Sequence, residues 1–513
     1  MWPTITVCNL NQVEASFMQD VGVYGDIEST NILINEFIHG RQEKLTADQE
    51  KIVNKVKNKI GNYWSFSDWS RQKCKDLFIS MSFRGKTLTW KDLPQDWELE
   101  EDLGPYLYPT DFGACCFLAP HLNLEETNWN LTYTEIYHEL IADSLNGETN
   151  GLDLVLDAEQ FNYAYYKANA AGFKIALHHH VEKPMIQFSS QLINSGTETQ
   201  INLKPTISYT TEDAIYAFPP EERGCYADGE ANLTYLIYAD GYRYEMNNCL
   251  IDEVIRDIIW NCRCTPRFWQ PCSFCDEDYS EFIKYCTGQG LYCANSRMKS
   301  IGQGKMSKEN DLIMPEALES PDMIGYISKP DPVKCIPACD VQENNNQMSF
   351  APYPQLGNFF YQKIFCDAAS HILQVTCEDA NRKFFMDKKQ PNLCLELNKF
   401  KEYFGSTTSC EYWPTNYFEN NDAPNESLVT ELYQYGRDNL ALVHVLVQSP
   451  YITKMKRDVS MTFTSYIANT GGLLGLCLGF SLITGFEMIF WCCCCCKEFK
   501  KNIAVIKPEV VRQ

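Results

Sequence analysis

The sequence predicts a cysteine-rich extracellular body of mixed helices and strands, attached to the membrane by one C-terminal transmembrane helix. Three observations lead to this expectation. Residues 471–496 form a long apolar stretch with a single formal charge, Glu487. Of the 24 cysteines, 18 lie between Cys8 and Cys410, and such an even set is typical of an oxidising compartment. The chain between them shows both helical and strand-like apolar patterns.

Length and composition limit the class of protein. The chain has 513 residues, which allows two to four domains or one large body with insertions. Contents of 45% hydrophobic and 13% aromatic residues exclude a disordered chain. A net charge of −23 argues against nucleic-acid binding, because phosphates need a basic surface. An acidic extracellular surface instead raises the local concentration of cations.

The cysteine pairs permit a second interpretation, as zinc ligands. The closely spaced pairs are Cys262/Cys264, Cys272/Cys275 and Cys335/Cys339. Regular CxxC…CxxC spacing is missing, so disulfides are favoured. Three N-glycosylation sequons support an extracellular body, and they begin at Asn130, Asn232 and Asn425.

The N-terminal half predicts one helix and then strands. A charged helix is expected over residues 48–59, and a second apolar stretch runs over 75–83. Prolines then break the chain into loops around Cys115 and Cys116. Strands are expected at 152–156, 172–178, 200–206 (ending at proline) and 233–239. The triplet His178-His179-His180 suggests a metal site, but adjacent strand residues point to opposite faces, so a strand end with exposed imidazoles is favoured.

The C-terminal half predicts a disulfide-linked layer of helices and loops. Helical patterns lie at 252–261 and 279–286, and residues 305–355 are polar, with Asn344-Asn345-Asn346 interpreted as a surface loop. A strong strand covers 439–447, and extended chain over 458–466 leads into the apolar stretch. The last strand is therefore expected to be mechanically coupled to the membrane helix.

The apolar stretch itself fits either a pore helix or a passive anchor. Its 26 residues span the ~30 Å apolar core of a bilayer at about 1.5 Å per residue. Gly471, Gly475 and Gly479 recur every four residues, which permits close helix approach in lipid. Glu487 is an ionisable group inside the span, and such groups usually face a bundle interior or water. Gly479-Phe480-Ser481 places small residues and carbonyls beside it, as a pore constriction requires.

The end of the stretch indicates topology. Lys497, Lys500 and Lys501 place the short tail in the cytoplasm by the positive-inside rule. The preceding cysteines are either palmitoylation sites or apolar residues that close the helix: Cys492, Cys493, Cys494, Cys495 and Cys496. The sequence contains no Gly-rich phosphate loop, no G-x-S-x-G and no H-E-x-x-H, so it is interpreted as non-enzymatic.

These residues resemble the degenerin/epithelial sodium channel family, which includes the acid-sensing channels. Its second transmembrane helix carries G-G-x-x-G-L-x-x-G-x-S and an acidic residue six positions on. The matching residues are Gly471-Gly472, Gly475-Leu476, Gly479-Phe480-Ser481 and Glu487. Outside the membrane, residues 3–9 look like the family's F-P-A-V-T-x-C-N, and residues 151–156, 171–178 and 439–447 resemble palm strands. Six cysteines resemble the cysteine framework of the thumb and its surroundings: Cys225, Cys249, Cys262, Cys264, Cys335 and Cys339.

The resemblance implies a hand-like α+β ectodomain with palm, β-ball, finger, thumb and knuckle parts. It implies a subunit of an amiloride-sensitive sodium channel, gated by ligand, protons or mechanical force, with a trimeric pore lined by the C-terminal helix. Na⁺ would be the permeant ion, with no cofactor, and the partners would be other channel subunits in a homo- or hetero-trimer in the plasma membrane. The implied selectivity filter is Gly479, Phe480 and Ser481; the implied pore and gate residues are Ala468, Asn469, Gly471, Gly472, Gly475 and Glu487. On an unbroken helix Phe480 and Glu487 would share a face.

The resemblance also implies a first transmembrane helix before residue 1, so the chain is interpreted as a subunit that lacks it. The expected divisions are 1–12 as the segment after that helix, 13–466 as the extracellular domain, 467–496 as the transmembrane helix and 497–513 as the cytoplasmic tail. A non-conducting single-pass glycoprotein, or a truncated regulatory subunit that assembles with channel subunits, stays open as the alternative.

Overall fold

The computed structural model describes residues 3–60, 72–83, 86–87, 107–118, 151–166, 170–179, 182–236, 244–269, 285–302, 334–404, 410–419, 421, 423–447, 452–461, 463–479 and 481–503. The chain divides into two compact units. The first comprises Met1–Ser208 and Gly224–Met455, and the second comprises Tyr209–Arg223 and Lys456–Gln513.

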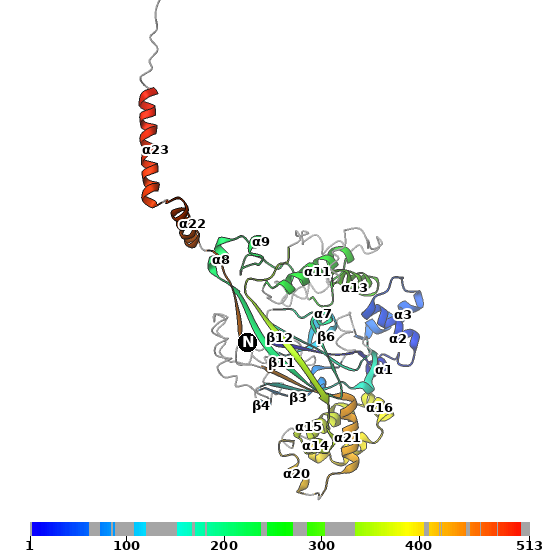
Figure 1. The fold of residues 1–513 in the computed structure, drawn as a ribbon. Helices are drawn as coiled ribbons and strands as arrows, with labels where there is room; N and C mark the ends of the chain where they lie inside the picture. The colour runs from blue at the N-terminus through cyan, green and yellow to red at the C-terminus, as the bar shows by residue number, and fades with distance from the viewer. Residues whose placement is uncertain are drawn as a thin grey trace, which may run out of the picture. The chain divides into compact units, whose positions relative to one another are not determined.

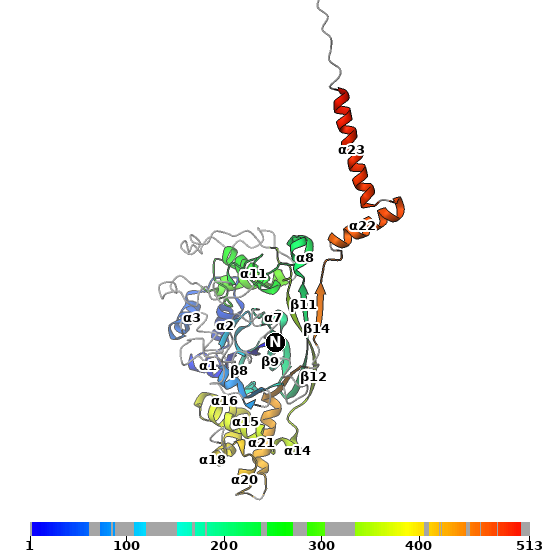
Figure 2. The ribbon, with the colours of Figure 1, turned by 90° about the vertical axis from the view of Figure 1, so that its left-hand side faces the viewer.

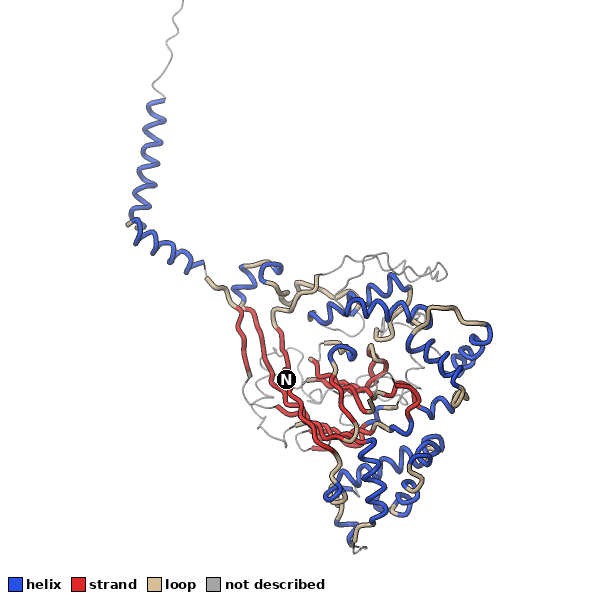
Figure 3. The backbone as a smooth tube through the Cα atoms, turned by 45° about the vertical axis from the view of Figure 1, so that its right-hand side comes forward, coloured by secondary structure: helices blue, strands red, loops and turns tan. Residues whose placement is uncertain are grey.

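Two β-sheets form the centre of the first unit (Figures 1 and 3). One is an antiparallel sheet of five strands: β10 (Gln191–Asn194), β9 (Gly172–His178), β1 (Thr4–Asn9), β6 (Gly113–Leu118) and β5 (Leu107–Thr110). The other has seven strands: β12 (Val341–Pro352), β11 (Thr197–Thr210), β13 (Leu440–Val447), β7 (Leu152–Asp157), β3 (Phe78–Phe83) and β4 (Lys86–Thr87), with β14 (Thr453–Arg457) also paired to β11. A separate ribbon joins β2 (Asn11–Glu14) and β8 (Tyr163–Tyr166).

The two sheets pack face to face because alternate apolar side chains of each point into a shared core. Ile5 and Val7 of β1 and Ile175 of β9 meet Leu154 of β7 and Val443 of β13 in this core, and all five are buried. The central strand β13 pairs in parallel with β11 and antiparallel with β7. Because β13 is buried on both faces, its sequence is a nearly continuous run of apolar residues.

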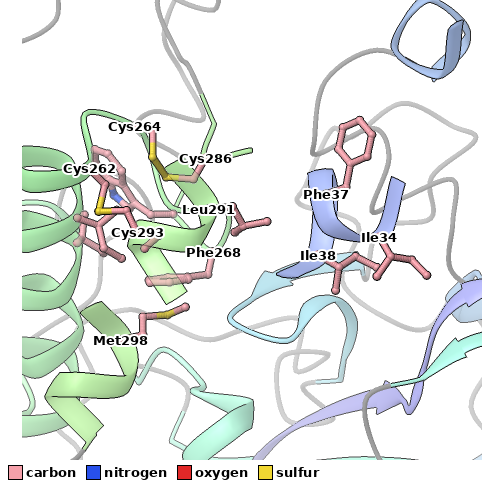
Figure 4. Close-up of a cluster of buried hydrophobic side chains, with 14 of the residues drawn as sticks. Ile34, Phe37, Ile38, Cys262, Cys264, Phe268, Cys286, Leu291, Cys293 and Met298 are labelled. Carbon is pink, nitrogen blue, oxygen red and sulfur yellow. A yellow bond between two sulfur atoms is a disulfide. The ribbon is translucent and has the colours of Figure 1, made fainter. Parts of the chain in front are cut away.

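A first helical layer packs around a separate apolar core. Its elements are α1 (Ala15–Asp20), α2 (Ile27–Ile34), the π-helix η1 (Asn35–His39), α3 (Ala47–Ile60), α11 (Met246–Cys262) and α13 (Gly288–Gly302). Phe37 and Ile38 of η1 and Leu291 of α13 belong to this core, and Figure 4 shows Leu291 near the disulfides Cys262–Cys293 and Cys264–Cys286. Gly40, at φ +76°, lets the chain leave η1 against the backbone of Tyr292, where an added Cβ would lie 2.1 Å from the Tyr292 nitrogen.

A second helical layer lies at the other end of the sheets from α11 and α13 (Figures 1 and 2). Its elements are α14 (Leu356–Phe359), α15 (Lys363–Ile372), the π-helix η4 (Leu373–Cys377), α16 (Ala380–Lys389), α17 (Leu393–Lys399), α18 (Lys401–Phe404), α20 (Thr415–Phe418) and α21 (Glu426–Asn439). Asp379 and Asn425 cap α16 and α21 through backbone N–H groups of the first turn. An aromatic cluster around Phe360, Trp413 and Tyr417 fills its interior.

Disulfides link distant parts of the chain within this unit. Eight are present among the described residues: Cys8–Cys115, Cys74–Cys116, Cys225–Cys339, Cys249–Cys335, Cys262–Cys293, Cys264–Cys286, Cys366–Cys410 and Cys377–Cys394. The prediction of a disulfide-rich body of helices and sheets is therefore confirmed. For Cys262/Cys264 and Cys335/Cys339 the zinc interpretation is wrong, because all four sulfurs are in disulfides; Cys272 and Cys275 lie outside the described residues.

The second unit contains short helices and the C-terminal segment. Its helices are α8 (Glu212–Ala217), α9 (Pro220–Arg223), α22 (Phe463–Leu478) and α23 (Leu482–Ile503). The backbone N–H of Thr211 donates to the carbonyl of Arg457, and its hydroxyl donates to Asp458. These bonds hold the residues before α8 against the chain that leads into α22.

Several expected elements are corrected. The strand expected at 200–206 continues past Pro205 to Thr210, because β11 pairs with β12 from Thr197 to Ser208. Asn344–Asn346, expected in a loop, lie in β12 for the same reason. Residues 233–236 are not a strand, because the carboxylate of Asp252 accepts hydrogen bonds from the N–H groups of residues 234–236. Residues 463–466, expected to be extended, begin α22.

Three smaller elements complete the first unit: α5 (Cys74–Leu77), α7 (Ile186–Ser189) and the 3₁₀ helix η3 (Gln160–Asn162). The stretch at 75–83 is thus a short helix followed by β3. The histidines at the end of β9 are not exposed as expected: His178 is buried, with a ring nitrogen 2.9 Å from the Thr6 hydroxyl, and His179 is buried beside it. His180 lies outside the described residues.

Candidate functional site

The predicted filter coincides with a break between two helices. The helix α22 ends at Leu478, and Gly479 has φ +62°, a left-handed conformation that favours glycine. The helix α23 begins at Leu482. The expectation of one continuous helix over residues 467–496 is therefore wrong. Across the described stretches of the chain, no helix is both long and apolar enough to cross a membrane.

Ser481 begins the second helix through its side chain. The N–H of Thr484 donates to Ser481 Oγ (3.2 Å), and the N–H of Ser481 donates to Thr484 Oγ1 (3.4 Å). The two hydroxyl oxygens are 3.0 Å apart. This reciprocal arrangement satisfies N–H groups that the first turn of a helix leaves without partners. A serine three residues before a threonine therefore restarts the helix directly after the left-handed glycine.

The break exposes backbone groups that a continuous helix would hide. The last four carbonyls of a helix have no intrahelical partners, and the C-terminal end of a helix carries partial negative charge. The end of α22 at Leu478 thus presents carbonyl oxygens beside Gly479 and Ser481, which are exposed in this chain. Oxygen ligands of this kind suit a hard cation such as Na⁺.

The other predicted pore residues are divided between the two helices. Ala468, Asn469, Gly471 and Gly472 lie on α22 and are exposed, and Gly475 is partly exposed. A Cβ added to Gly471 or Gly472 would meet no described atom within 4 Å. These glycines therefore leave room for another helix to approach closely.

Glu487 is exposed in the second turn of α23. A shared face for Phe480 and Glu487 was expected only on an unbroken helix, and that condition is not met, because α22 ends at Leu478 and α23 begins at Leu482. Phe480 itself lies outside the described residues.

The predicted modification sites differ in their surroundings. Asn232 is exposed, whereas Asn425 is half-buried and caps α21 through its side-chain oxygen, which accepts from the N–H of Leu428 at 2.8 Å. Asn130 lies outside the described residues. Cys492, Cys493 and Cys494 are exposed free thiols on α23. The side chains of Cys495 and Cys496 are outside the described set, and glycosylation and palmitoylation stay predictions.

The first unit contains a site that sequence analysis missed, the buried carboxyl cluster of Glu14, Asp76, Asp157 and Glu159 around Arg382. The guanidinium of Arg382 on α16 lies 2.8 Å from Asp76, 3.5 Å from Glu14 and 3.6 Å from Glu159. All four carboxyl residues are at most 7% exposed. The cluster therefore joins the second helical layer to β2, α5 and the end of β7.

The cluster has more carboxyl groups than positive charges. Burial raises the pKa of Glu14 to about 8. Burial, with the neighbouring charge of Glu159, also raises the pKa of Asp157 to about 8. His371 on α15 adds no compensating charge at neutral pH, because burial lowers its pKa to about 4. Since unpaired carboxylates are costly to bury, the packed cluster retains protons near neutral pH.

Hydrogen bonds fix the geometry of the cluster. Tyr435 of α21 donates to Asp157 at 2.6 Å. Asn162 donates to Glu14 at 2.8 Å and to Glu159 at 3.3 Å. Glu159 has a left-handed φ of +46°, which is unusual for a residue with a Cβ. The adjacency of Asp157 and Glu159 to a predicted strand end was the one sequence signal for this site.

Comparison with known proteins gives a consistent result. A family model described as "Amiloride-sensitive sodium channel" matches residues 1–491. The chain is 21% identical to Pickpocket protein 28 of Drosophila melanogaster over 528 residues, covering 96% of this chain and 66% of that protein. It is 29% identical over 152 residues to the gamma subunit of the epithelial sodium channel of Xenopus laevis, covering 29% of this chain and 21% of the relative. It is 23% identical over 279 residues to acid-sensing ion channel 1 of Gallus gallus, covering 51% of this chain and 45% of the relative.

Proposed function

The chain belongs to the amiloride-sensitive sodium channel family, the degenerin/epithelial sodium channel family that its sequence resembles, and we propose that it is a subunit of a sodium-conducting, amiloride-sensitive channel in the plasma membrane. In this proposal the first unit is extracellular, the segment from α22 to α23 enters the membrane, and the tail after α23 is cytoplasmic. Three subunits, identical or related, surround one pore lined by this segment.

The observation that carries the proposal is the helix break at Gly479. Ions passing this point would meet carbonyl oxygens at the end of α22 and the hydroxyl of Ser481, which replace water in the coordination of Na⁺. Interrupted helices at functional depth are used in this way because they free carbonyls without a lipid-exposed loop. Gly479, Phe480 and Ser481 form the filter, and Glu487 is the acid beyond it.

Opening is proposed to involve α22 near Ala468. The strand β13 is held between β7 and β11 in the centre of its sheet, so a change in that sheet is transmitted along the chain toward α22. The open faces of Gly471 and Gly472 support close packing between the α22 helices of neighbouring subunits.

Protons are the stimulus that the first unit supports best. The buried carboxyl cluster joins the second helical layer to the strands, and its packed form retains protons. Acid-sensing ion channel 1 is among the relatives of the chain. Loss of protons from the cluster would place more negative charge around the single Arg382 guanidinium, and repulsion between the buried carboxylates would alter the packing against β7.

The proposal is tested by Gly479→Arg in the chain co-expressed with a complete subunit of the family. A side chain at φ +62° is strained, and a guanidinium in the filter opposes cations electrostatically. We expect loss of the amiloride-sensitive sodium current with unchanged surface labelling.

Gly357→Arg is the matched control, because Gly357 on α14 has open space around it. This variant should leave the current at the wild-type level. Unchanged current from Gly479→Arg at full surface incorporation would overturn the pore assignment and favour a non-conducting glycoprotein that assembles with channel subunits.

A further inference from the structure

Three aromatic rings gather around an ammonium group on the surface of the first unit. The Nζ atom of Lys388 lies 3.9 Å from the ring centroid of Phe384, 5.3 Å from that of Phe385 and 5.5 Å from that of Tyr24. The rings of Tyr24 and Phe385 meet edge to face at 4.8 Å, and those of Phe384 and Phe385 at 5.2 Å. We call Tyr24, Phe384 and Phe385 the aromatic box.

Two separate segments build the aromatic box. Phe384, Phe385 and Lys388 lie on α16, while Tyr24 lies in the turn between α1 and α2. Phe385 is 4% exposed and forms the floor, whereas Tyr24 and Phe384 are 47% and 44% exposed. One ring from each segment is therefore accessible to solvent.

The described contacts of the Lys388 ammonium are with the aromatic rings and not with a carboxylate. Lys388 has no ion pair with any carboxylate that the structure describes, although the chain has 67 acidic residues. The Asp20 carboxylate nevertheless lies at the same junction, where it accepts a hydrogen bond of 2.5 Å from Asn381 of α16. A negative charge near open aromatic faces increases their attraction for cations.

We propose that the aromatic box is a binding site for an organic ammonium group, either a quaternary ammonium or a methylated amine, and that Lys388 occupies it in the free protein. A primary ammonium is strongly hydrated, so it loses more on entering the rings than a methylated ammonium does. A ligand of this class would therefore displace the lysine, whose long side chain can turn into solvent. The bound ligand would contact both α16 and the α1–α2 turn.

The test uses the full chain in a non-ionic detergent with tetramethylammonium chloride as the probe. Binding is measured by saturation-transfer NMR on the probe's methyl resonance, with sodium chloride keeping the ionic strength constant. Wild-type chain should bind in the millimolar range. Lys388→Ala should tighten binding about two- to five-fold, the factor that one cation–π contact contributes at an exposed site. Lys389→Ala, on the same helix without a described ring contact, should match wild type.

The rings are tested in the Lys388→Ala chain. Phe384→Leu keeps an apolar side chain of similar volume but removes the aromatic face, and it should weaken binding at least about two-fold. Tyr24→Leu should do the same from the other segment, so the result does not depend on one variant. Neutral tert-butanol, of similar shape, should bind more weakly than the cation.

Unchanged affinity in Lys388→Ala, retained affinity in both leucine variants, or equal binding of tert-butanol would overturn the proposal. The readout is binding alone, so it is independent of whether the chain conducts ions.

Discussion

Replacing Glu14 by glutamine should make the opening of the contact between α16 and the sheets less dependent on pH. Glu14 is 6% exposed, and its pKa is raised by burial from 4.5 to about 8. The packed state binds the Glu14 proton more tightly than the opened state does. Its stability relative to the opened state is therefore greatest below pH 4.5 and falls progressively as the pH rises to about 8. Glutamine keeps an oxygen that can accept from Asn162 and cannot lose a proton.

The size of the expected pH dependence follows from the release of one proton, that of Glu14, when the contact opens. Between the two pKa values the opened state has released the Glu14 proton and the packed state has not, so the opening constant rises about tenfold per pH unit. From pH 5.5 to pH 7.5, the opening constant of wild type should therefore rise about 100-fold more than that of Glu14→Gln. Asp157 contributes its own slope to both chains, and that slope cancels in the comparison.

The assay is hydrogen–deuterium exchange of α16 amides in the full chain. Amides of α3 serve as the internal reference for the intrinsic pH dependence of exchange. Asp48→Asn is the control, because the Asp48 side chain is 90% exposed and its titration should not affect α16. Parallel pH profiles of wild type and Glu14→Gln would refute the assignment of a retained proton to Glu14.

Three further predictions concern stability and covalent linkage. Arg382→Met should lower the free energy of unfolding by about 3–5 kcal/mol, because it leaves buried carboxylates unpaired. Adding Asp76→Asn should restore part of the lost stability. A denaturant titration in which Arg382→Met is as stable as wild type would contradict this prediction. Partial burial alone would lower the pKa of His444, but the hydrogen bond and charge of Asp153 raise it above its usual value. His444→Gln should therefore lower the melting temperature more at pH 5.5 than at pH 9, and a difference independent of pH would refute the ion pair. Cys115→Ser should make Cys8 available to alkylation in a non-reducing peptide map; a protected Cys8 would contradict the observed pairing.

Local patterns predicted several strands of the core and two helices, and the helix predicted at 252–261 lies within α11. Residues 152–156 and 172–178 alternate between apolar and polar positions because one face of each strand is buried, and β7 and β9 lie where expected. The charged helix at 48–59 is α3, whose apolar residues are spaced for one face. These elements could be predicted because their own side chains carry the pattern.

Elements that depend on distant partners could not be predicted. The amide-rich residues 344–346 form part of β12 only because β11 supplies its hydrogen bonds. The second helical layer consists largely of short helices held by aromatic packing and by disulfides such as Cys366–Cys410, and its sequence lacks a long periodic stretch. The buried carboxyl cluster combines Glu14 and Arg382, which are 368 residues apart.

The predicted filter residues were identified by motif, but their local structure was not. An apolar stretch with glycine every four residues reads as one helix, and only the backbone shows that Gly479 is left-handed. The spacing of Ser481 and Thr484 was the available signal for a new helix start, since it matches a helix cap. The break moves Glu487 out of register with the residues of α22.

The central claim is that this chain contributes Gly479 and Ser481 to a sodium-conducting pore, and ion selectivity tests it most directly. The measurement is the reversal potential under bi-ionic Na⁺/K⁺ conditions in cells that express the chain with a complete family subunit. Ser481→Ala removes a hydroxyl beside the freed carbonyls and should shift the reversal potential toward lower preference for Na⁺, with the current still present. An identical reversal potential, with surface labelling showing the variant in the assembled channel, would contradict the account.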